Sequence, residues 1–281
     1  CQGNLPIFSS DSYRNLATAL NYGLCYTDLP ERVFILPQEL KPLVQKVLED
    51  EDISLMLYLQ NIVYTYCFTA VYLFGIYPVE KLLQRVQEAL EIPLTMNEFQ
   101  NLAMNTERSQ QEYALSDGYL VDKIFLLPEE KNNLAALKKM QQSSTKPVFW
   151  PDSDTMIQLA DEGWLISEEL YEDFAENFES CLNPQIQDIA EAMRTMERLI
   201  RTGYDFSSIM KLLDKHYFHF PDVKSYKQFV SALQQIWNET PMWCNNGFSP
   251  NQLRRQLGKP KTDNVVSLAS HQKKKKKKRK K

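Results

Sequence analysis

Two short segments of the chain, 91 residues apart, have closely similar sequences. Segment 31–39 reads ERVFILPQE and segment 122–130 reads DKIFLLPEE, and the match continues upstream to Tyr22 and Tyr113. Self-similarity at a fixed offset is the signature of a repeated structural unit. The sequence therefore predicts one small module that occurs twice, with the first copy cut short at Cys1.

In the second copy, the hydrophobic pattern predicts three helices followed by a β-hairpin. Thr95 with Glu98 three residues later is a capping-box signature for the third helix. Asp117-Gly118 indicates a tight hairpin turn, because both residues tolerate positive φ angles. This order of elements is typical of a winged helix-turn-helix module. The predicted helices span 53–75, 79–91 and 95–107, and the predicted strands span 113–115 and 119–127.

The first copy has the same hairpin, with less sequence ahead of it. A helix is predicted at 11–21, with Gly23 as its stop, and short strands are predicted at 24–27 and 32–36. Proline is favoured at the first position of a helix, where its missing N–H costs nothing. Pro37 and Pro128 are therefore expected to open the helices that follow the two hairpins and end near residues 49 and 142.

Residues 143–153 contain two prolines and several polar residues without periodicity, which indicates a boundary. Beyond it the pattern is helical, with Asn183-Pro184 and Ser249-Pro250 as start signals and Gly258 as the last stop. The predicted helices span 154–161, 167–181, 184–202, 206–216, 222–238 and 249–257.

The predicted fold class is mainly α, with tandem winged-helix-like units, the first truncated, followed by a helical domain and a disordered basic tail. The domain boundaries follow from the same signals. They are 1–50 for the truncated unit, 51–142 for the complete unit, 143–153 for the linker, 154–258 for the helical domain and 259–281 for the flexible tail.

The charge of the chain is divided between an acidic body and a basic tail. The whole chain has 32 basic and 36 acidic residues, a net charge of −4, but nine of the basic residues stand consecutively at 273–281. The rest of the chain therefore carries 23 basic and 36 acidic residues, or −13. A run of like charges repels itself and buries nothing, so we expect the tail to be unfolded alone.

The tail is the clearest candidate for a binding site. Adjacent cations displace counterions from a phosphate backbone, which gives tight but sequence-independent binding to nucleic acid or to the ribosome. The same run can contact an anionic membrane, fold back on the acidic body, serve as a nuclear import signal or simply remain solvated. The candidate nucleic-acid-binding residues are Lys273, Lys274, Lys275, Lys276, Lys277, Lys278, Arg279, Lys280 and Lys281.

Residues 53–79 contain no charged residue, which is long enough to suggest a membrane span. Polar residues such as Gln60 and Asn61 and five tyrosines spread through the run favour a helix buried in protein instead. The five cysteines are widely spaced and form no CxxC pair, which favours a reducing, cytoplasmic location over a disulfide framework. A lipidated Cys1 is the alternative to a truncated first copy.

The sequence lacks the signatures of the common catalytic sites. No nucleophile elbow, phosphate-binding loop, dinucleotide fingerprint or HExxH motif is present. His216 and His219 have the i, i+3 spacing of a metal pair, but no further ligand is near in sequence. We therefore predict no enzyme, no cofactor and no metal, and keep a composite site around these histidines as a third hypothesis.

The helices at the recognition position are poor in cations. Helix 95–107 offers Asn97, Gln100 and Asn101, whose amides can read adenine, but it also carries acidic residues. The equivalent helix 11–21 has Arg14 as its one cation. Docking on DNA depends on positive charge, so a structural or protein-binding role for both modules is favoured.

One segment carries a family resemblance. Residues 238–253, NETPMWCNNGFSPNQL, resemble a segment of pattern N-x-T-P-x-W-x-x-x-G-x-[ST]-P-x-E-L in uncharacterised bacterial proteins that often end in a SEC-C motif. Those proteins finish with a cysteine-rich zinc knuckle near lysines, whereas here no cysteine follows Cys244. The resemblance implies a cytoplasmic protein associated with nucleic acid or the ribosome, without the zinc. The matching residues are Asn238, Thr240, Pro241, Trp243, Gly247, Ser249, Pro250 and Leu253, with Gln252 in place of the usual Glu.

Together these observations favour a non-enzymatic accessory or regulatory protein that contacts nucleic acid or the ribosome through its basic tail. The alternative is a protein-interaction adaptor that uses the winged-helix-like units, with the tail incidental. The two hypotheses differ in whether removal of 273–281 abolishes function.

Overall fold

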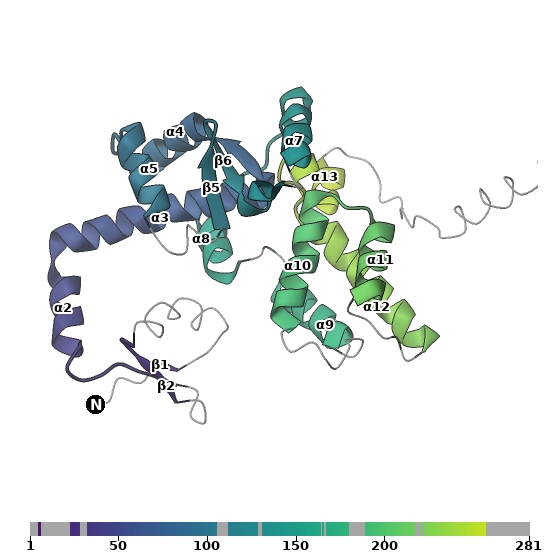
Figure 1. Cartoon of the computed structure of the whole chain (residues 1–281), viewed down its shortest axis with the longest axis horizontal. Helices are drawn as coiled ribbons and strands as arrows, with labels where there is room; N and C mark the ends of the chain where they lie inside the picture. Colours follow the sequence, from purple (N-terminus) through teal and green to yellow (C-terminus); the bar gives the residue numbers. More distant parts are fainter. Residues whose placement is uncertain are drawn as a thin grey trace, which may run out of the picture.

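The computed structural model of the chain describes residues 5–6, 23–28, 33–105, 112–128, 131–163, 165, 167–179, 189–216, 220 and 222–256. The described structure is mainly α-helical, with two small three-stranded sheets, which confirms the predicted mainly α class (Figure 1). The predicted helix 11–21, the start signal Asn183-Pro184 and the basic tail lie outside these residues.

The central part of the molecule alternates helices with short strands. The order is α3 (Glu51–Phe74), β4 (Ile76–Pro78), α4 (Val79–Leu90), α5 (Met96–Met104), β5 (Tyr113–Ser116) and β6 (Tyr119–Asp122). The sheet order is β4-β6-β5 and both pairings are antiparallel. All three predicted helices are confirmed, and the turn between β5 and β6 has positive φ at Asp117 (49°) and Gly118 (75°), as a type I′ turn requires.

Two details of this sheet differ from the prediction. Strand β4 was not expected, because three residues at the end of a long uncharged run carry no period of their own. Strand β6 stops at Asp122 instead of continuing to 127, since the Asp122 carboxylate accepts the N–H of Ile124 (2.9 Å) and starts the 3₁₀ helix η1 (Lys123–Leu126).

The amino-terminal part contains a smaller sheet. Strands β1 (Leu5–Pro6), β2 (Tyr26–Asp28) and β3 (Val33–Ile35) pair antiparallel in the order β1-β3-β2. The predicted hairpin is present, but Pro37 does not open the helix that follows. The N–H of Leu40 donates to the carbonyl of Pro37 (3.1 Å) in a turn, and α2 (Lys41–Glu49) begins with Pro42 in its first turn.

The residue match between segments 31–39 and 122–130 does not carry over to local conformation. Segment 33–35 forms strand β3, whereas the matching segment 124–126 lies in η1. The helices that follow, α2 and α7 (Lys131–Ser143), both begin after a hairpin. The offset of 91 residues therefore aligns the helices better than it aligns the strands.

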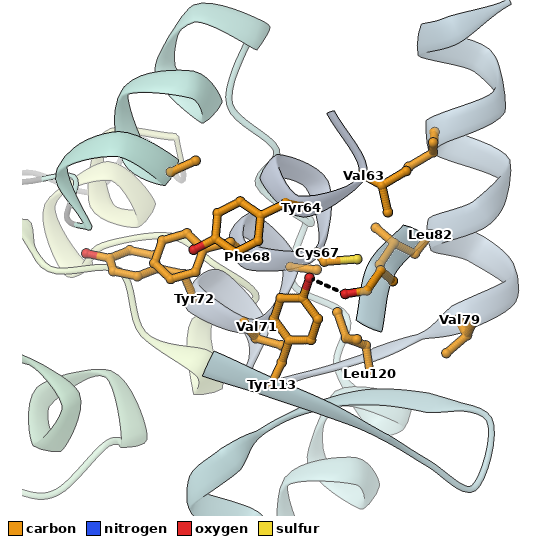
Figure 2. Close-up of a cluster of buried hydrophobic side chains, with 14 of the residues drawn as sticks. Val63, Tyr64, Cys67, Phe68, Val71, Tyr72, Val79, Leu82, Tyr113 and Leu120 are labelled. Carbon is orange, nitrogen blue, oxygen red and sulfur yellow. Dashed lines mark hydrogen bonds between the residues drawn. The ribbon is translucent and has the colours of Figure 1, made fainter. Parts of the chain in front are cut away.

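The main core lies between α3, α4, α5, the second sheet and α8 (Ser153–Glu162). Figure 2 shows aromatic and aliphatic side chains of α3 packed against Leu82 and Leu120, with the Tyr113 hydroxyl donating to the carbonyl of Ala103 (2.9 Å). Although the sequence placed α8 in the carboxyl-terminal domain, its buried residues Leu159 and Ala160 belong to this core. Within the described residues, no helix has the length and apolar character needed to cross a membrane.

The described residues of the carboxyl-terminal part are mainly helical, in line with the prediction. This part comprises α9 (Glu168–Glu179), α10 (Ile189–Thr202), α11 (Phe206–His216), α12 (Val223–Glu239), the 3₁₀ helix η3 (Trp243–Asn245) and α13 (Pro250–Gln256). Its core contains Phe174, Ile200, Phe229 and Leu233. The predicted cap of α13 is confirmed, because Ser249 Oγ accepts the N–H of Gln252 (3.1 Å).

Candidate functional site

The residues predicted to bind nucleic acid lie beyond the part of the chain that the structure describes. The described chain ends with α13 at Gln256, and the nine cations begin at Lys273. Their binding role stays a prediction.

The two histidines of the HxxH motif are not brought into a described site. His216 is the last residue of α11, and His219 lies outside the described residues. Across the described ranges, the structure brings together no group of three or more His, Cys, Asp or Glu side chains that fits a metal ion.

The outer face of α5 presents amides and a carboxylate. Asn97 and Asn101 are exposed and Gln100 is half-buried. The predicted capping box is confirmed: Glu98 accepts hydrogen bonds from the hydroxyl and the N–H of Thr95, both at 2.7 Å. These bonds, the hydroxyl bond first, lower the pKa of Glu98 and keep it ionised. The start of α5 thus carries a negative charge, which repels a phosphate backbone.

The arginine of the neighbouring helix α4 is engaged in an aromatic cluster. The Arg85 guanidinium lies 4.5 Å from the centre of the Trp150 ring, and its Nε donates to the Tyr77 hydroxyl at 3.4 Å. The Tyr77 and Trp150 rings meet edge to face with centroids 5.5 Å apart. This cation is therefore held against Trp150 instead of being presented beside α5 to a phosphate.

A buried polar network joins α3 to the carboxyl-terminal helices, and Tyr72 is its centre. The Tyr72 hydroxyl donates to Glu197 Oε1 and accepts the N–H of Leu165 (3.2 Å). The Tyr72 carbonyl accepts from Trp243 Nε1 (3.0 Å) and from Arg201 Nη1 (3.4 Å). The Arg201 guanidinium also lies over the Tyr72 ring, 4.3 Å from its centre. Four residues from three other parts of the chain thus meet at Tyr72.

The charges of this network lie in a protein interior. Burial raises the pKa of Glu197 and of Asp122, against the opposing effect of the nearby arginines. Burial also works against the Arg201 cation, but the acids around it, Glu197 first, more than offset this and hold the pKa of Arg201 above its usual value. Arg198 reaches Asp122 from the half-buried rim at 4.0 Å. Each buried charge is compensated by an opposite one.

The segment around η3 also contacts the end of α3 and the predicted linker. The Trp243 ring lies against Gly75 so closely that a Cβ atom at Gly75 would fall 2.5 Å from the ring. Asn246 donates to Ser144 Oγ (3.1 Å) and to the carbonyl of Lys146 (3.0 Å), which ties the predicted linker to η3. Two of the residues that carry the SEC-C resemblance, Trp243 and Gly247, therefore lie in contact with the end of α3.

The network and the η3 segment fix the two halves relative to each other. Leaving one buried hydrogen-bonding group without its partner costs about 1–3 kcal/mol, and this joint contains several such groups, so it resists opening. Sequence reasoning missed it, although a signal was present. Glu197 and Arg201 are spaced i, i+4 and stand next to Met196 and Ile200, which lie in the carboxyl-terminal core. Such a pair is ordinarily read as a surface salt bridge.

A second feature is an exposed apolar surface, which we call the apolar corner: helix α2 together with residues 51–62 of α3. Eight large apolar side chains in it are between 41% and 64% exposed. None of the residues of α2 is buried. In Figure 1, α2 and the amino-terminal end of α3 extend away from the rest of the central part. The eight side chains are Leu43, Val44, Val47, Leu48, Leu55, Met56, Leu57 and Tyr58.

The expectation that the uncharged run is a helix buried on most sides is thus correct for only one half of α3. Residues 63–74 are buried except for Tyr66, whereas the amino-terminal half is largely exposed. Contiguous exposed apolar surface of this kind typically marks a protein interaction site.

Comparisons of the chain with protein-family models, with curated proteins and with solved structures found no match.

Proposed function

We propose that this chain is a non-enzymatic accessory protein that contacts nucleic acid or the ribosome through residues 273–281. The observation that carries this proposal is the separation of charge, nine consecutive cations attached to a body of net charge −13. Lysine runs bind phosphates by releasing counterions, without reading bases. The family resemblance of residues 238–253 points to the same class of partner.

The proposed body of this protein is a winged-helix-like unit followed by a helical domain. Support for the unit comes from the order helix, strand, helix, helix, strand, strand over residues 51–122, with the three strands in the order β4-β6-β5. The first sheet has the same antiparallel order, β1-β3-β2, which supports a second, partial copy.

The proposal assigns the contact to the tail and not to α5. An ionised Glu98 at the start of α5 repels phosphates, and no lysine or arginine occurs within α5. Amides alone provide base contacts but little of the electrostatic attraction that drives docking. Under this proposal the unit belongs to the body that carries the tail and makes no phosphate contact of its own.

The test compares the whole chain with a chain ending at Gln272 for binding to a labelled duplex and to a structured RNA across a salt series. We expect binding by the whole chain alone, without sequence preference. The slope of log affinity against log salt on the duplex should grow by about −0.9 for each phosphate neutralised. Replacing Lys273, Lys274 and Lys275 by Gln should reduce this slope in proportion.

The matched control removes exposed body cations, by the substitutions Lys224→Gln and Lys227→Gln on α12. We expect no change in slope. Sequence-selective binding by the chain that ends at Gln272 would contradict the proposal and assign the contact to the winged-helix-like units.

The second candidate function is a protein-interaction adaptor, and the apolar corner is the observation that favours it. A surface with eight exposed large apolar side chains is suited to a protein partner. Under this alternative, the chain ending at Gln272 keeps its function, whereas polar substitutions in the apolar corner abolish it.

A further inference from the structure

The contact between η3 and segment 143–149 is built on Asn246-Gly247, the one Asn-Gly pair in the chain. Asparagine is a chemically labile residue. It loses its amide most readily when glycine follows, because a glycine N–H without a neighbouring side chain can approach the amide carbon. The chain thus has a labile pair at a contact that helps to hold its two halves together.

The packing of α3 requires a glycine at position 247. The φ of Gly247 is 84°, which a residue with a side chain rarely adopts. A Cβ atom at this position would lie 3.1 Å from Phe74 Cε1 and 3.2 Å from Leu73 Cβ, both in the buried end of α3. A larger residue, which would slow the loss of the amide, is therefore excluded by the fold.

Asn246 is held through both its side chain and its backbone. Its φ of 52° and ψ of 44° are left-handed, a conformation that asparagine adopts more readily than most residues. The residue is 7% exposed, and its Nδ2 donates to Ser144 Oγ (3.1 Å) and to the carbonyl of Lys146 (3.0 Å). The Asn246 carbonyl accepts the N–H of Phe149 (3.0 Å). Three hydrogen bonds thus join this one residue to segment 143–149.

Deamidation of such a pair needs only water and a base. The Gly247 nitrogen gives its proton to hydroxide and attacks Cγ of Asn246. The new N–Cγ bond closes a cyclic imide, the Cγ–Nδ2 bond breaks, and ammonia leaves. Water then opens the imide at Cγ, which gives aspartate, or at the backbone carbonyl carbon, which gives isoaspartate. Nothing is oxidised or reduced in either step.

The folded geometry opposes the attack. The Gly247 N–H donates to the carbonyl of Met242 (3.3 Å). Ring closure requires rotation about the Cα–C bond of Asn246, which would break this bond and the bond to Phe149. The amide itself is held by its two acceptors. The reaction therefore requires η3 and segment 143–149 to separate first.

The products do not fit the position that the asparagine occupies. Aspartate has no N–H to donate, and its carboxylate would face the carbonyl oxygen of Lys146 at a buried position, which costs free energy. The Lys146 ammonium is already bonded to the Cys244 carbonyl and to Asn245 Oδ1, both at 2.8 Å. Isoaspartate lengthens the backbone by one carbon and so disrupts the turn after η3.

We propose that Asn246 is a latent deamidation site, protected while segment 143–149 contacts η3, and that its conversion to aspartate or isoaspartate releases this contact. A transient opening then becomes permanent, because the modified chain cannot remake the bonds of the amide. The pair therefore makes opening of this contact a one-way event.

The first experiment follows deamidation of the whole chain at mildly alkaline pH by peptide mapping and mass spectrometry, in buffer and in denaturing urea. We expect conversion of Asn246 to be at least about tenfold slower in buffer, because it must wait for a local opening. Ser144→Ala removes the acceptor shared by Asn246 Nδ2 and the N–H of Lys146 and should raise the rate in buffer about fivefold. The matched control is Ser143→Ala, whose hydroxyl donates to the Met140 carbonyl instead, and it should leave the rate unchanged.

The second experiment introduces the product directly. Asn246→Asp should raise the hydrogen-exchange rate of the Phe149 N–H at least about tenfold, since this amide bonds to residue 246. Asn97→Asp, at an exposed position on α5, adds the same charge elsewhere and should leave that rate unchanged.

Equal conversion rates in buffer and in urea would overturn the proposal, because the contact would then give no protection. Absence of conversion in urea would overturn it as well, and so would an Asn246→Asp variant that keeps the protection of Phe149. The first experiment uses the parent chain, so it stays decisive if Asn246→Asp does not fold. Neither experiment bears on the tail proposal, which a chain ending at Gln272 tests separately.

Discussion

Tyr72 is the residue at which the two halves of the molecule meet, and its hydroxyl has two partners there. Tyr72→Phe removes the donor to Glu197 and the acceptor for the N–H of Leu165. A buried group left without its partner costs about 1–3 kcal/mol, so we expect the unfolding free energy to fall by about that amount. Urea denaturation measures the change.

The matched control is Tyr58→Phe on the same helix, where the side chain is 58% exposed. We expect a change within about 0.5 kcal/mol, as for most surface substitutions. Equal effects of the two substitutions would argue that the network around Tyr72 contributes nothing specific.

The burial of Glu197 leads us to expect an unusual pH dependence of the unfolding free energy. Burial raises its pKa in the folded state above the unfolded value of about 4.3. Between the two values the folded protein holds more protons, so the contribution of Glu197 to stability falls as the pH rises and levels off above the folded-state pKa. The unfolding free energy of the parent minus that of Glu197→Gln should therefore decrease as the pH rises through this window.

Glu98 is the control, because its contribution to stability should change with pH in the opposite direction. Hydrogen bonds from Thr95 lower the pKa of Glu98 in the folded state, so its contribution to stability is present above the unfolded pKa and is lost as the pH falls. The difference between the parent and Glu98→Gln should thus increase with rising pH. Urea unfolding over a pH series measures both differences, and a flat profile for Glu197→Gln would contradict a buried, ionisable carboxyl.

At the scale of elements, the contact between the end of α3 and η3 depends on a glycine. Gly75 has a positive φ of 69°, and a Cβ atom there would fall within 3 Å of the Trp243 ring. Gly118, in the β5–β6 turn, has a φ of 75° but open space around a Cβ. Replacing either glycine therefore costs free energy because of its positive φ. Only at Gly75 would the new Cβ atom also clash with a neighbouring ring.

We expect Gly118→Ala to lower the unfolding free energy by about 1–2 kcal/mol, the cost of a left-handed conformation in a residue with a Cβ. Gly75→Ala should cost more than this and should also change the tryptophan fluorescence, because the Trp243 ring must move. If both variants lose the same stability with no spectral change, the close contact between α3 and η3 is not maintained in solution.

Elements with local signals were predictable from the sequence. The capping box of Thr95 and Glu98 and the Asp117-Gly118 turn each depend on residues within a few positions, and both are confirmed. Strand β4 was missed because its pairing with β6 depends on residues more than 40 positions away. The end of β6 was missed because one carboxylate, that of Asp122, starts η1.

The buried network could not be predicted either, because it also depends on residues far apart in the sequence. In the sequence, Glu197 and Arg201 resemble an ordinary surface pair. In the structure they are buried because Tyr72, 125 residues from Glu197, lies against them. The exposure of the amino-terminal half of α3 could not be predicted from the sequence, because this half is as poor in charge as the buried half. The composition of a helix shows which of its residues can be buried. Which of them are buried depends on the elements that pack against the helix.

At the scale of the whole molecule, the separation of charge predicts that the body weakens the contact of the tail with nucleic acid. The chain without residues 273–281 carries a net charge of −13, so it repels the phosphates that the tail is proposed to bind.

A peptide of residues 259–281 should therefore bind a labelled duplex more tightly than the whole chain does at low salt, and the difference should shrink as the salt concentration rises, because salt screens the repulsion from the body. Fluorescence anisotropy across a salt series measures both affinities. Equal affinities at low salt would mean that the acidic body lies too far from the bound tail to repel the duplex. Tighter binding by the whole chain would place part of the nucleic-acid contact in the body, against its net charge.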